Sequence, residues 1–184
     1  PNAGIAQAEK PERVVIDYSA PNVAKQMHVG HLRSTIIGDC FNRVLSAQGH
    51  TVIPQNHIGD WGTQFGMLIE YIVEKRMDVE DFDLSGVEQL YQDSKKTFDA
   101  DPQFADRARR RVVKLQGGDA ETLRIWRTLI DISLEGFNAT YSRLSVLLTD
   151  EDVAGESSYN DDLPRVVDGL VGDGLAGEDN GALG

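Results

Sequence analysis

Two histidines that bracket a glycine, His28 and His31 around Gly30, carry the clearest chemistry in this chain of 184 residues. They stand where an apolar run, residues 14–16, and a Pro-Asn turn give way to a helical pattern. The first N–H groups of a helix lack partners within it, and the helix dipole adds partial positive charge there, so such a junction suits a phosphate. Gly30 has no Cβ to block a ligand, and histidines three residues apart share one face of the first turn. The spacing therefore predicts a phosphate-binding site at a strand-to-helix turn.

Other roles for these residues stay open from the pattern alone. Histidines at a helix start also serve as caps or lie on the surface. A metal site has less support, because no third ligand is obvious near the pair. Lys25, just before the helix, is a point charge suited to phosphates, but it is also what a solvated loop lysine looks like.

The elements that position these residues follow from hydrophobic periodicity. Residues 13–18 predict a strand that is apolar almost throughout, as expected for a strand covered on both faces. Residues 51–56 predict a second strand, and the long connection between the two implies a parallel pair. Between them, residues 29–48 predict an amphipathic helix whose apolar stripe faces inward: Leu32, Ile36, Ile37, Cys40, Phe41, Val44 and Leu45. This is half of an α/β, doubly wound parallel-sheet nucleotide-binding fold, whose ligands bind beyond the carboxyl ends of the strands.

The rest of the chain reads as mostly helical. Residues 63–76 predict a helix, and residues 78–118 form a charged segment with breaks at Gly86, Pro102 and Gly117. A short strand at 145–148, a helix at 158–171 and the start of a hairpin at 175–183 follow. The predicted inward residues of the helix at 63–76 are Phe65, Leu68, Ile69 and Ile72, and a long helix is predicted from the stripe Leu123, Trp126, Ile130, Leu134, Phe137, Tyr141 and Leu144.

Residues 28–31, His-Val-Gly-His, resemble the HIGH signature of class I aminoacyl-tRNA synthetases, and residues 19–25 before them resemble the arginyl-tRNA synthetase form of that signature. Residues 59–66, Gly-Asp-Trp-Gly-Thr-Gln-Phe-Gly, are similar to a second block of the same family. The long blocks are more specific than the quartet alone. The signature region comprises Pro21, Asn22, Val23, Ala24, Lys25, Gln26, Met27, His28, Val29, Gly30 and His31.

The resemblance implies an arginine–tRNA ligase, which activates L-arginine with ATP to arginyl-adenylate and transfers the arginyl group to tRNA(Arg). The attacking carboxylate belongs to the substrate, so the protein supplies position and donors for the charge on the phosphates. The resemblance assigns catalysis to His28, His31 and Lys25, and ATP binding to these three with Gly30. Mg²⁺ is expected on the nucleotide, and no protein-bound metal is predicted.

For the arginine substrate, the resemblance implies a pocket with acids for the guanidinium group. At Ala20 relatives often have serine, so only the backbone could contact the substrate there. Glu156 could equally be an ordinary acid in the first turn of a helix, and Asp60 with Trp61 could simply form a tight turn. The predicted arginine-binding residues are Asp17, Ala20, Asn22, His31, Gln64 and Glu156.

The resemblance also divides the chain. Residues 1–12 are expected to be an N-terminal arm or linker, and 13–76 the first half of the catalytic nucleotide-binding domain. Residues 77–143 are expected to be a helical connective insertion, and 144–184 a truncated continuation of the catalytic domain. We expect the chain to be a fragment of a longer, monomeric enzyme, inactive by itself because a downstream lysine loop lies beyond it.

Composition and net charge limit the classes of protein to which this chain can belong. A net charge of −12 counts against broad nonspecific binding to nucleic acid, although basic residues gather at 107–114, as a solvated helix face or a tRNA contact. No apolar run approaches the roughly 20 residues that span a bilayer, no signal peptide is visible, and one cysteine makes a disulfide framework impossible, so we expect a cytoplasmic protein. A synthetase for another amino acid, such as cysteine, would need zinc-binding cysteines that this chain lacks. A non-catalytic truncated paralogue that binds ATP or tRNA is the alternative of a different kind.

Overall fold

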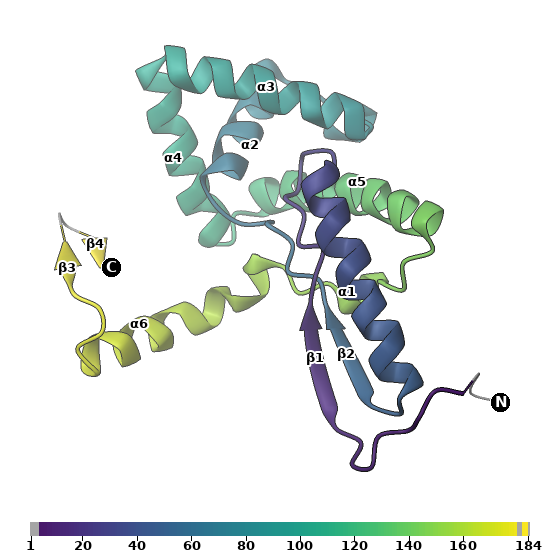
Figure 1. Ribbon diagram of the computed structural model, residues 1–184. Coiled ribbons are helices and arrows are strands. Elements are labelled where there is room, and N and C mark those ends of the chain that lie inside the picture. Colours follow the sequence, from purple (N-terminus) through teal and green to yellow (C-terminus); the bar gives the residue numbers. More distant parts are fainter. Residues whose placement is uncertain (1–3, 180–181, 184) are drawn as a thin grey trace.

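The predicted strand–helix–strand unit is present in the computed structural model, which describes residues 4–179 and 182–183. Strands β1 (Arg13–Asp17) and β2 (Thr51–Gln55) pair in parallel, with Arg13 opposite Thr51 and Asp17 opposite Gln55. Helix α1 (Val29–Ala47) connects them and lies along the sheet (Figure 1). Gly49, at φ +92°, makes the turn from α1 into β2, a backbone conformation that glycine adopts without steric cost.

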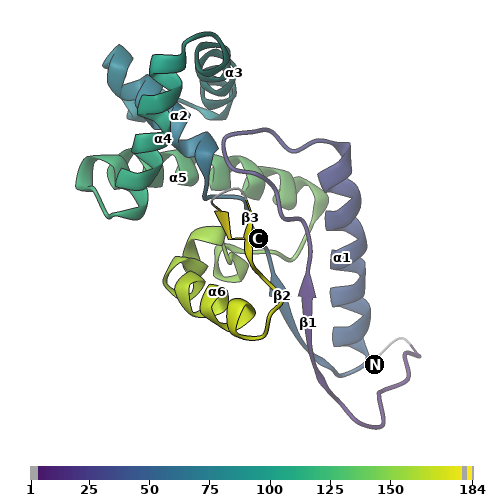
Figure 2. The same cartoon turned by 90° about the vertical axis from the view of Figure 1, so that its left-hand side faces the viewer.

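Four α-helices form a second layer, which we call the helical cluster: α2 (Thr63–Lys75), α3 (Leu84–Ala100), α4 (Pro102–Gln116) and α5 (Ala120–Leu144). A 3-10 turn, η1 (Val79–Asp81), joins α2 to α3. Both β-arrows point towards this cluster, which lies beyond the carboxyl ends of the strands (Figures 1 and 2). The cluster therefore borders the crevice in which such a fold binds its ligands.

Aspartates explain where the helices of the charged segment begin. Asp83 accepts a hydrogen bond from the Gly86 N–H at 2.8 Å, and Asp101 accepts one from the Gln103 N–H at 2.8 Å. Both satisfy N–H groups that the first helical turn leaves unpaired. Pro102 follows its cap directly, at a position where its missing N–H costs nothing.

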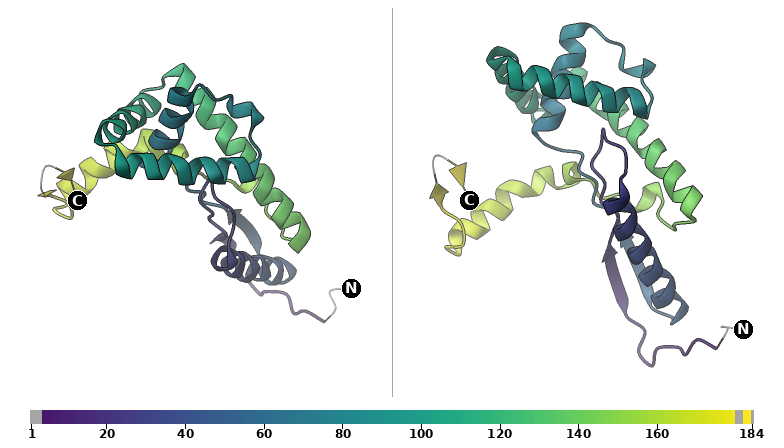
Figure 3. Two further views of the ribbon diagram at one scale, coloured as in Figure 1. Left: turned by 90° about the horizontal axis from the view of Figure 1, so that it is seen from above. Right: turned by 45° about the horizontal axis from the view of Figure 1, so that its top comes forward.

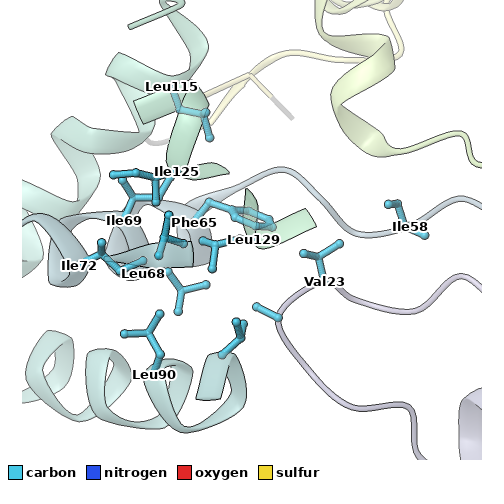
Figure 4. Close-up of a cluster of buried hydrophobic side chains, with 13 residues drawn as sticks. Val23, Ile58, Phe65, Leu68, Ile69, Ile72, Leu90, Leu115, Ile125 and Leu129 are labelled. Carbon is cyan, nitrogen blue, oxygen red and sulfur yellow. The ribbon is translucent and has the colours of Figure 1, made fainter. Parts of the chain in front are cut away.

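The core of the helical cluster is apolar and contains the inward residues predicted for α2. Phe65, Leu68, Ile69 and Ile72 are all buried and pack with side chains of α3, α4 and α5 (Figure 4). Burial of each such side chain stabilises the fold by about 1.5–3 kcal/mol. Val23 of the signature region enters the same cluster, so the loop before α1 is anchored to the helices by packing. The domain division at residue 76 stays a prediction.

The predicted inward stripe of α1 is wrong. Its apolar residues Ile36, Ile37, Phe41 and Val44 are about half exposed, with relative accessibilities of 53%, 52%, 57% and 48%. The buried face is small and polar instead, and it pairs with distant backbone and side chains. That face consists of Thr35, Gly38, Asp39 and Asn42.

The expectation that β1 is covered on both faces is also wrong, because exposure alternates along it and Val15 is 62% exposed. The stripe predicted for α5 is shifted as well. Phe137 and Tyr141 are buried as predicted, but Ile125 and Leu129 take the central positions and Leu144 is exposed. A helix packed from more than one side buries residues that a single stripe does not predict.

After α5 the chain departs from the predicted elements. Residues 145–148 form no strand, and the chain pairs with the sheet further on, at a parallel bridge between Asn56 and Val153. The predicted helix at 158–171 divides into a 3-10 segment, η3 (Glu156–Asp162), and α6 (Leu163–Gly172), with Pro164 in the first turn of α6. A further 3-10 turn, η2 (Asp150–Asp152), precedes them.

The last described strands are β3 (Glu178–Asp179) and β4 (Ala182–Leu183), which pair antiparallel, so the hairpin begins later than the predicted residue 175. Its expected turn at residues 180–181 lies outside the described residues. Helix α6 and the hairpin extend away from the sheet and the helical cluster, as Figure 1 and the right-hand view of Figure 3 show.

Candidate active site

The signature region begins with a sharp turn at the carboxyl end of β1. Ser19 and Ala20 both have left-handed backbone, at φ +74° and +48°. Residues with side chains adopt this conformation only when the surrounding structure imposes it, at a cost of about 1 kcal/mol or more each. The Ala20 N–H donates to Asn56 Oδ1 at 3.0 Å, so the end of β2 helps to hold the turn.

The two sequence blocks meet, as predicted, at the carboxyl ends of the strands. The Val23 N–H donates to the Gly59 carbonyl and the Gly59 N–H donates to the Pro21 carbonyl, both at 3.1 Å. Asn22 and Gly59 thereby form a parallel bridge. A Cβ at Gly59 would lie 2.4 Å from the Asn22 side-chain oxygen, so a larger residue there would displace the Asn22 side chain.

His28 and His31 lie together at the start of α1, where the sequence placed them. Their rings stack with centroids 3.9 Å apart and planes inclined by 21°. His28 Nδ1 accepts the Gly30 N–H at 3.1 Å, and His31 Nδ1 accepts the His28 N–H at 3.2 Å. Both histidines therefore cap the helix in this state, and a phosphate that takes the Gly30 N–H must displace the His28 ring.

The environment keeps His31 neutral. Burial lowers the pKa of His31, and the adjacent His28 ring lowers it further. His28 is exposed and His31 is half-buried, so both remain open to solvent at the crevice rather than packed into the core.

Lys25 lies against the helical cluster instead of in open solvent. Its Nζ is 4.4 Å from the centre of the Tyr91 ring of α3, within range of a cation–π interaction. The two residues share a cavity of about 470 Å³ with His28. The remaining lining residues are Gln26, Met27, Glu88 and Gln92.

The acids predicted for the arginine pocket lie at the ends of both strands. Asp17 closes β1, and its carboxylate is 3.1 Å from His57 Nδ1. Glu156 is exposed, and its N–H donates to the Ile58 carbonyl at 3.2 Å, which places it just past β2. Buried Asp60 holds this segment in place by accepting hydrogen bonds from the N–H and hydroxyl of Ser157, at 2.9 and 2.5 Å.

Gln64 and Trp61 complete the second block. Gln64 donates to the Gly59 carbonyl at 3.3 Å, so its amide supports the loop from inside rather than facing open space. Trp61 packs edge-on against Trp126 of α5, with ring centroids 5.4 Å apart. Among the described residues, the buried Trp61 indole N–H finds no hydrogen-bond acceptor.

Two of the basic residues at 107–114 form salt bridges with α2, whereas Arg109, Arg110 and Lys114 are exposed. Buried Arg111 donates to Glu70 of α2 at 2.9 Å, and Arg107 pairs with Glu70 at 3.2 Å and with Glu74. These pairs clamp α4 onto α2. Arg110 and Lys114 line a cavity of 350 Å³ beside them.

Sequence reasoning missed three residues at this site: Asn56, Tyr91 and Tyr141. From the sequence, Asn56 was predicted only as the end of a strand, and Tyr141 only as one member of an apolar stripe. A polar atom on an otherwise apolar helix face was the available signal, because a buried hydroxyl needs a partner. Tyr91 gave no signal, because its contact with Lys25 joins segments that are far apart in sequence.

The parallel strands, with a histidine-capped helix at their carboxyl ends and a helical layer beside it, have the architecture of a class I tRNA synthetase catalytic domain. The chain belongs to the family described as tRNA synthetases class I (R), catalytic domain, whose model matches residues 2–183.

Relatives of the whole chain support that membership. This chain is 98% identical over 183 residues to an arginine–tRNA ligase of Cutibacterium acnes. The matched region covers 100% of this chain and 33% of that protein. The chain is 57% identical over 180 residues to an arginine–tRNA ligase of Pseudomonas aeruginosa, with 98% of this chain and 30% of that protein covered. The chain thus spans about a third of the length of these curated relatives.

Solved structures of two arginyl-tRNA synthetases are similar to this structure. The arginyl-tRNA synthetase of Plasmodium falciparum superposes with a TM-score of 0.79 and 38% identity, over 95% of this chain and 29% of that one. The arginyl-tRNA synthetase of Thermus thermophilus, at 20% identity and a TM-score of 0.64, over 92% of this chain and 28% of that one, shares the fold.

The residues that the structure describes contain neither a membrane-spanning helix nor a metal-binding cluster. None of their helices is long and apolar enough to cross a bilayer. Within the same residues, no group of three or more His, Cys, Asp or Glu side chains is arranged to hold a metal ion.

Proposed function

We propose that the protein containing this chain is an arginine–tRNA ligase, and that this segment supplies the signature-bearing half of its active site. The observation that carries the proposal is the pair His28 and His31, stacked at the first turn of α1 at the carboxyl ends of two parallel strands. The family membership and the two arginine–tRNA ligases above support the choice of amino acid.

In the first step, a carboxylate oxygen of arginine attacks the α-phosphate of ATP and pyrophosphate leaves. His28 leaves its capping position to donate to a phosphate oxygen, and the freed Gly30 N–H donates beside it. His31, neutral in the free enzyme, donates to the charge that develops on the phosphates. Lys25 moves from the Tyr91 ring to the leaving pyrophosphate. Mg²⁺ is carried by the nucleotide.

The arginine lies between the ends of the two strands. Its α-groups contact the Ala20 backbone and the Asn22 side chain, and its guanidinium group faces Asp17 and Glu156. Asp17 would then exchange its contact with His57 for one with the guanidinium cation of the substrate. In the second step, a hydroxyl of the terminal adenosine of tRNA(Arg) attacks the arginyl carbonyl and AMP leaves.

ATP–pyrophosphate exchange on the full-length enzyme, with each amino acid and with or without tRNA, tests the proposal. Arginine should be the only amino acid that supports exchange. His31→Ala should reduce exchange by about a hundredfold, the usual effect of removing one transition-state donor. His50→Ala is the matched control, because His50 accepts the Glu12 N–H at the opposite end of the sheet. Normal exchange in His31→Ala would remove His31 from the mechanism, and no arginine-dependent exchange in the wild type would favour the non-catalytic paralogue.

A further inference from the structure

A buried chain of hydrogen bonds runs from the end of β2 to the signature turn. Asn56 Nδ2 donates to the Tyr141 hydroxyl at 3.2 Å, and that hydroxyl lies 2.7 Å from Ser19 Oγ. All three side chains are nearly inaccessible to solvent, at 1%, 3% and 3%. The chain therefore joins β2 and the last turns of α5 to the left-handed turn after β1.

The same chain continues into the helix that carries the signature. Thr35 Oγ1 of α1, which is fully buried, lies 2.8 Å from Ser19 Oγ and also 2.8 Å from the His31 carbonyl oxygen. The carbonyl of His31 sits one helical turn before Thr35, so this contact reaches the residue whose imidazole faces the crevice.

The Asn56 end of the chain has a defined orientation. The Ala20 N–H can only donate, so the Asn56 amide turns its oxygen to Ala20 and its NH₂ to Tyr141. The Thr35 hydroxyl is directed as a donor at both Ser19 Oγ and the His31 carbonyl oxygen, so its single proton serves both contacts. Between Ser19 and Tyr141, either hydroxyl can donate to the other.

We propose that Tyr141 is a positioning residue for the adenylation site, because its hydroxyl closes the buried hydrogen-bonded chain that holds the Ser19–Ala20 turn and the first turn of α1 in place relative to each other. The proposal rests on the function proposed above. This proposal gives the helical cluster a defined role: its last helix, α5, determines where the Ser19–Ala20 turn and His31 lie relative to each other.

The environment of Tyr141 fits this role. Burial raises the pKa of the Tyr141 hydroxyl, so the hydroxyl keeps its proton at neutral pH. Its ring packs with Tyr18, Phe137 and Leu148, which keep water from competing for the hydroxyl. Without that hydroxyl, the Asn56 amide and the Ser19 hydroxyl would each lack a buried partner.

The test uses two isosteric deletions at different points of the chain, Tyr141→Phe and Thr35→Val, in the full-length enzyme. Each should lower kcat/KM for arginine in ATP–pyrophosphate exchange by about tenfold, the usual effect of one buried polar group left unpaired. Thr35→Ser retains the hydroxyl and should restore most of the activity. Tyr71→Phe is the matched control, because the Tyr71 ring packs edge-on against Phe104 within the helical cluster and away from the signature turn.

The double variant Tyr141→Phe/Thr35→Val distinguishes positioning from two separate structural defects. If one chain links both residues, the double variant should be about as active as either single variant, whereas independent defects would multiply to about a hundredfold. Thermal unfolding of each variant identifies any loss of folded protein, and if Tyr141→Phe does not fold, Thr35→Val and Thr35→Ser still test the chain.

Three results would overturn the inference: exchange by Tyr141→Phe at the level of Tyr71→Phe, multiplicative losses in the double variant, or no difference between Thr35→Ser and Thr35→Val. Failure of the proposed function has a different signature, because the wild type itself would then show no arginine-dependent exchange.

Discussion

Substitution of Gly38 by alanine should force α1 away from β1. A Cβ at this position would lie 2.2 Å from both Cβ and Cγ of Tyr18, roughly 1 Å closer than the ordinary contact range of 3.4–4 Å. The Tyr18 Cβ is attached to the strand backbone and cannot rotate aside, and Tyr18 is itself 3% exposed. The helix must therefore shift, and the 2.8 Å contact between Thr35 and Ser19 would lengthen with it.

The magnitude follows from two opposing terms. Overpacking of this kind costs up to about 3 kcal/mol, whereas alanine is about 1 kcal/mol better than glycine inside a helix. The net loss in the free energy of unfolding is about 2 kcal/mol, which corresponds to a Tm lower by about 4–8 °C for a domain of this size. Thermal unfolding followed by circular dichroism measures the shift, and ATP–pyrophosphate exchange below the transition measures its effect on the site.

Gly169→Ala is the matched control. Gly169 lies within α6, and a Cβ there meets no atom within 4 Å among the described residues, so alanine should stabilise α6 by up to about 1 kcal/mol. A Gly38→Ala variant that unfolds at or above the wild-type Tm would refute the close contact between α1 and Tyr18. Normal exchange in a destabilised Gly38→Ala variant would show that the contact matters for stability only.

Three further predictions concern charged groups. Glu70→Gln should destabilise the helical cluster by about 3 kcal/mol in urea unfolding, because it leaves buried Arg111 without its close carboxylate. Glu121 lies 3.8 Å from Arg111 and is mostly exposed, so Glu121→Gln should cost less than about 1 kcal/mol. Equal effects would contradict the role of the Arg111–Glu70 pair in holding α4 against α2. Burial and the adjacent His28 ring lower the pKa of His31, so the unfolded chain binds this proton more readily, and stability should fall as the pH drops from the ordinary pKa of about 6.5 towards the lowered one. The wild type should therefore lose more Tm between pH 7.5 and 5.5 than His31→Gln, and an equal loss would show that His31 does not titrate in this window. Binding of ATP, whose negative charge favours protonated His31, should take up protons near pH 6.5, which calorimetry in two buffers of different ionisation enthalpy measures.

The local sequence pattern was sufficient to predict much of the fold around the site. The alternation of apolar strands with a helix predicted the parallel pair, and the signature quartet was placed at the start of α1, where the structure has it. The inward residues of α2 were predicted because its apolar residues recur on a single face that packs into one core. Pro102 and Gly117 marked the two ends of α4, because their backbone constraints act within a few residues, whereas the predicted break at Gly86 is wrong, since Gly86 lies in the first turn of α3.

Tertiary structure decided which partners the polar groups have. Helix α1 buries Asp39 and Asn42 rather than its apolar stripe, because the Leu147 N–H and the Tyr18 hydroxyl pair with them. Hydrophobic periodicity cannot predict this face, since a buried polar group is tolerated only when a partner from elsewhere in the chain satisfies it. The buried hydrogen-bonded chain through Tyr141 has the same origin: the residue types were visible in the sequence, but hydrogen bonds between segments that are distant along the chain exist only once the fold has brought them together.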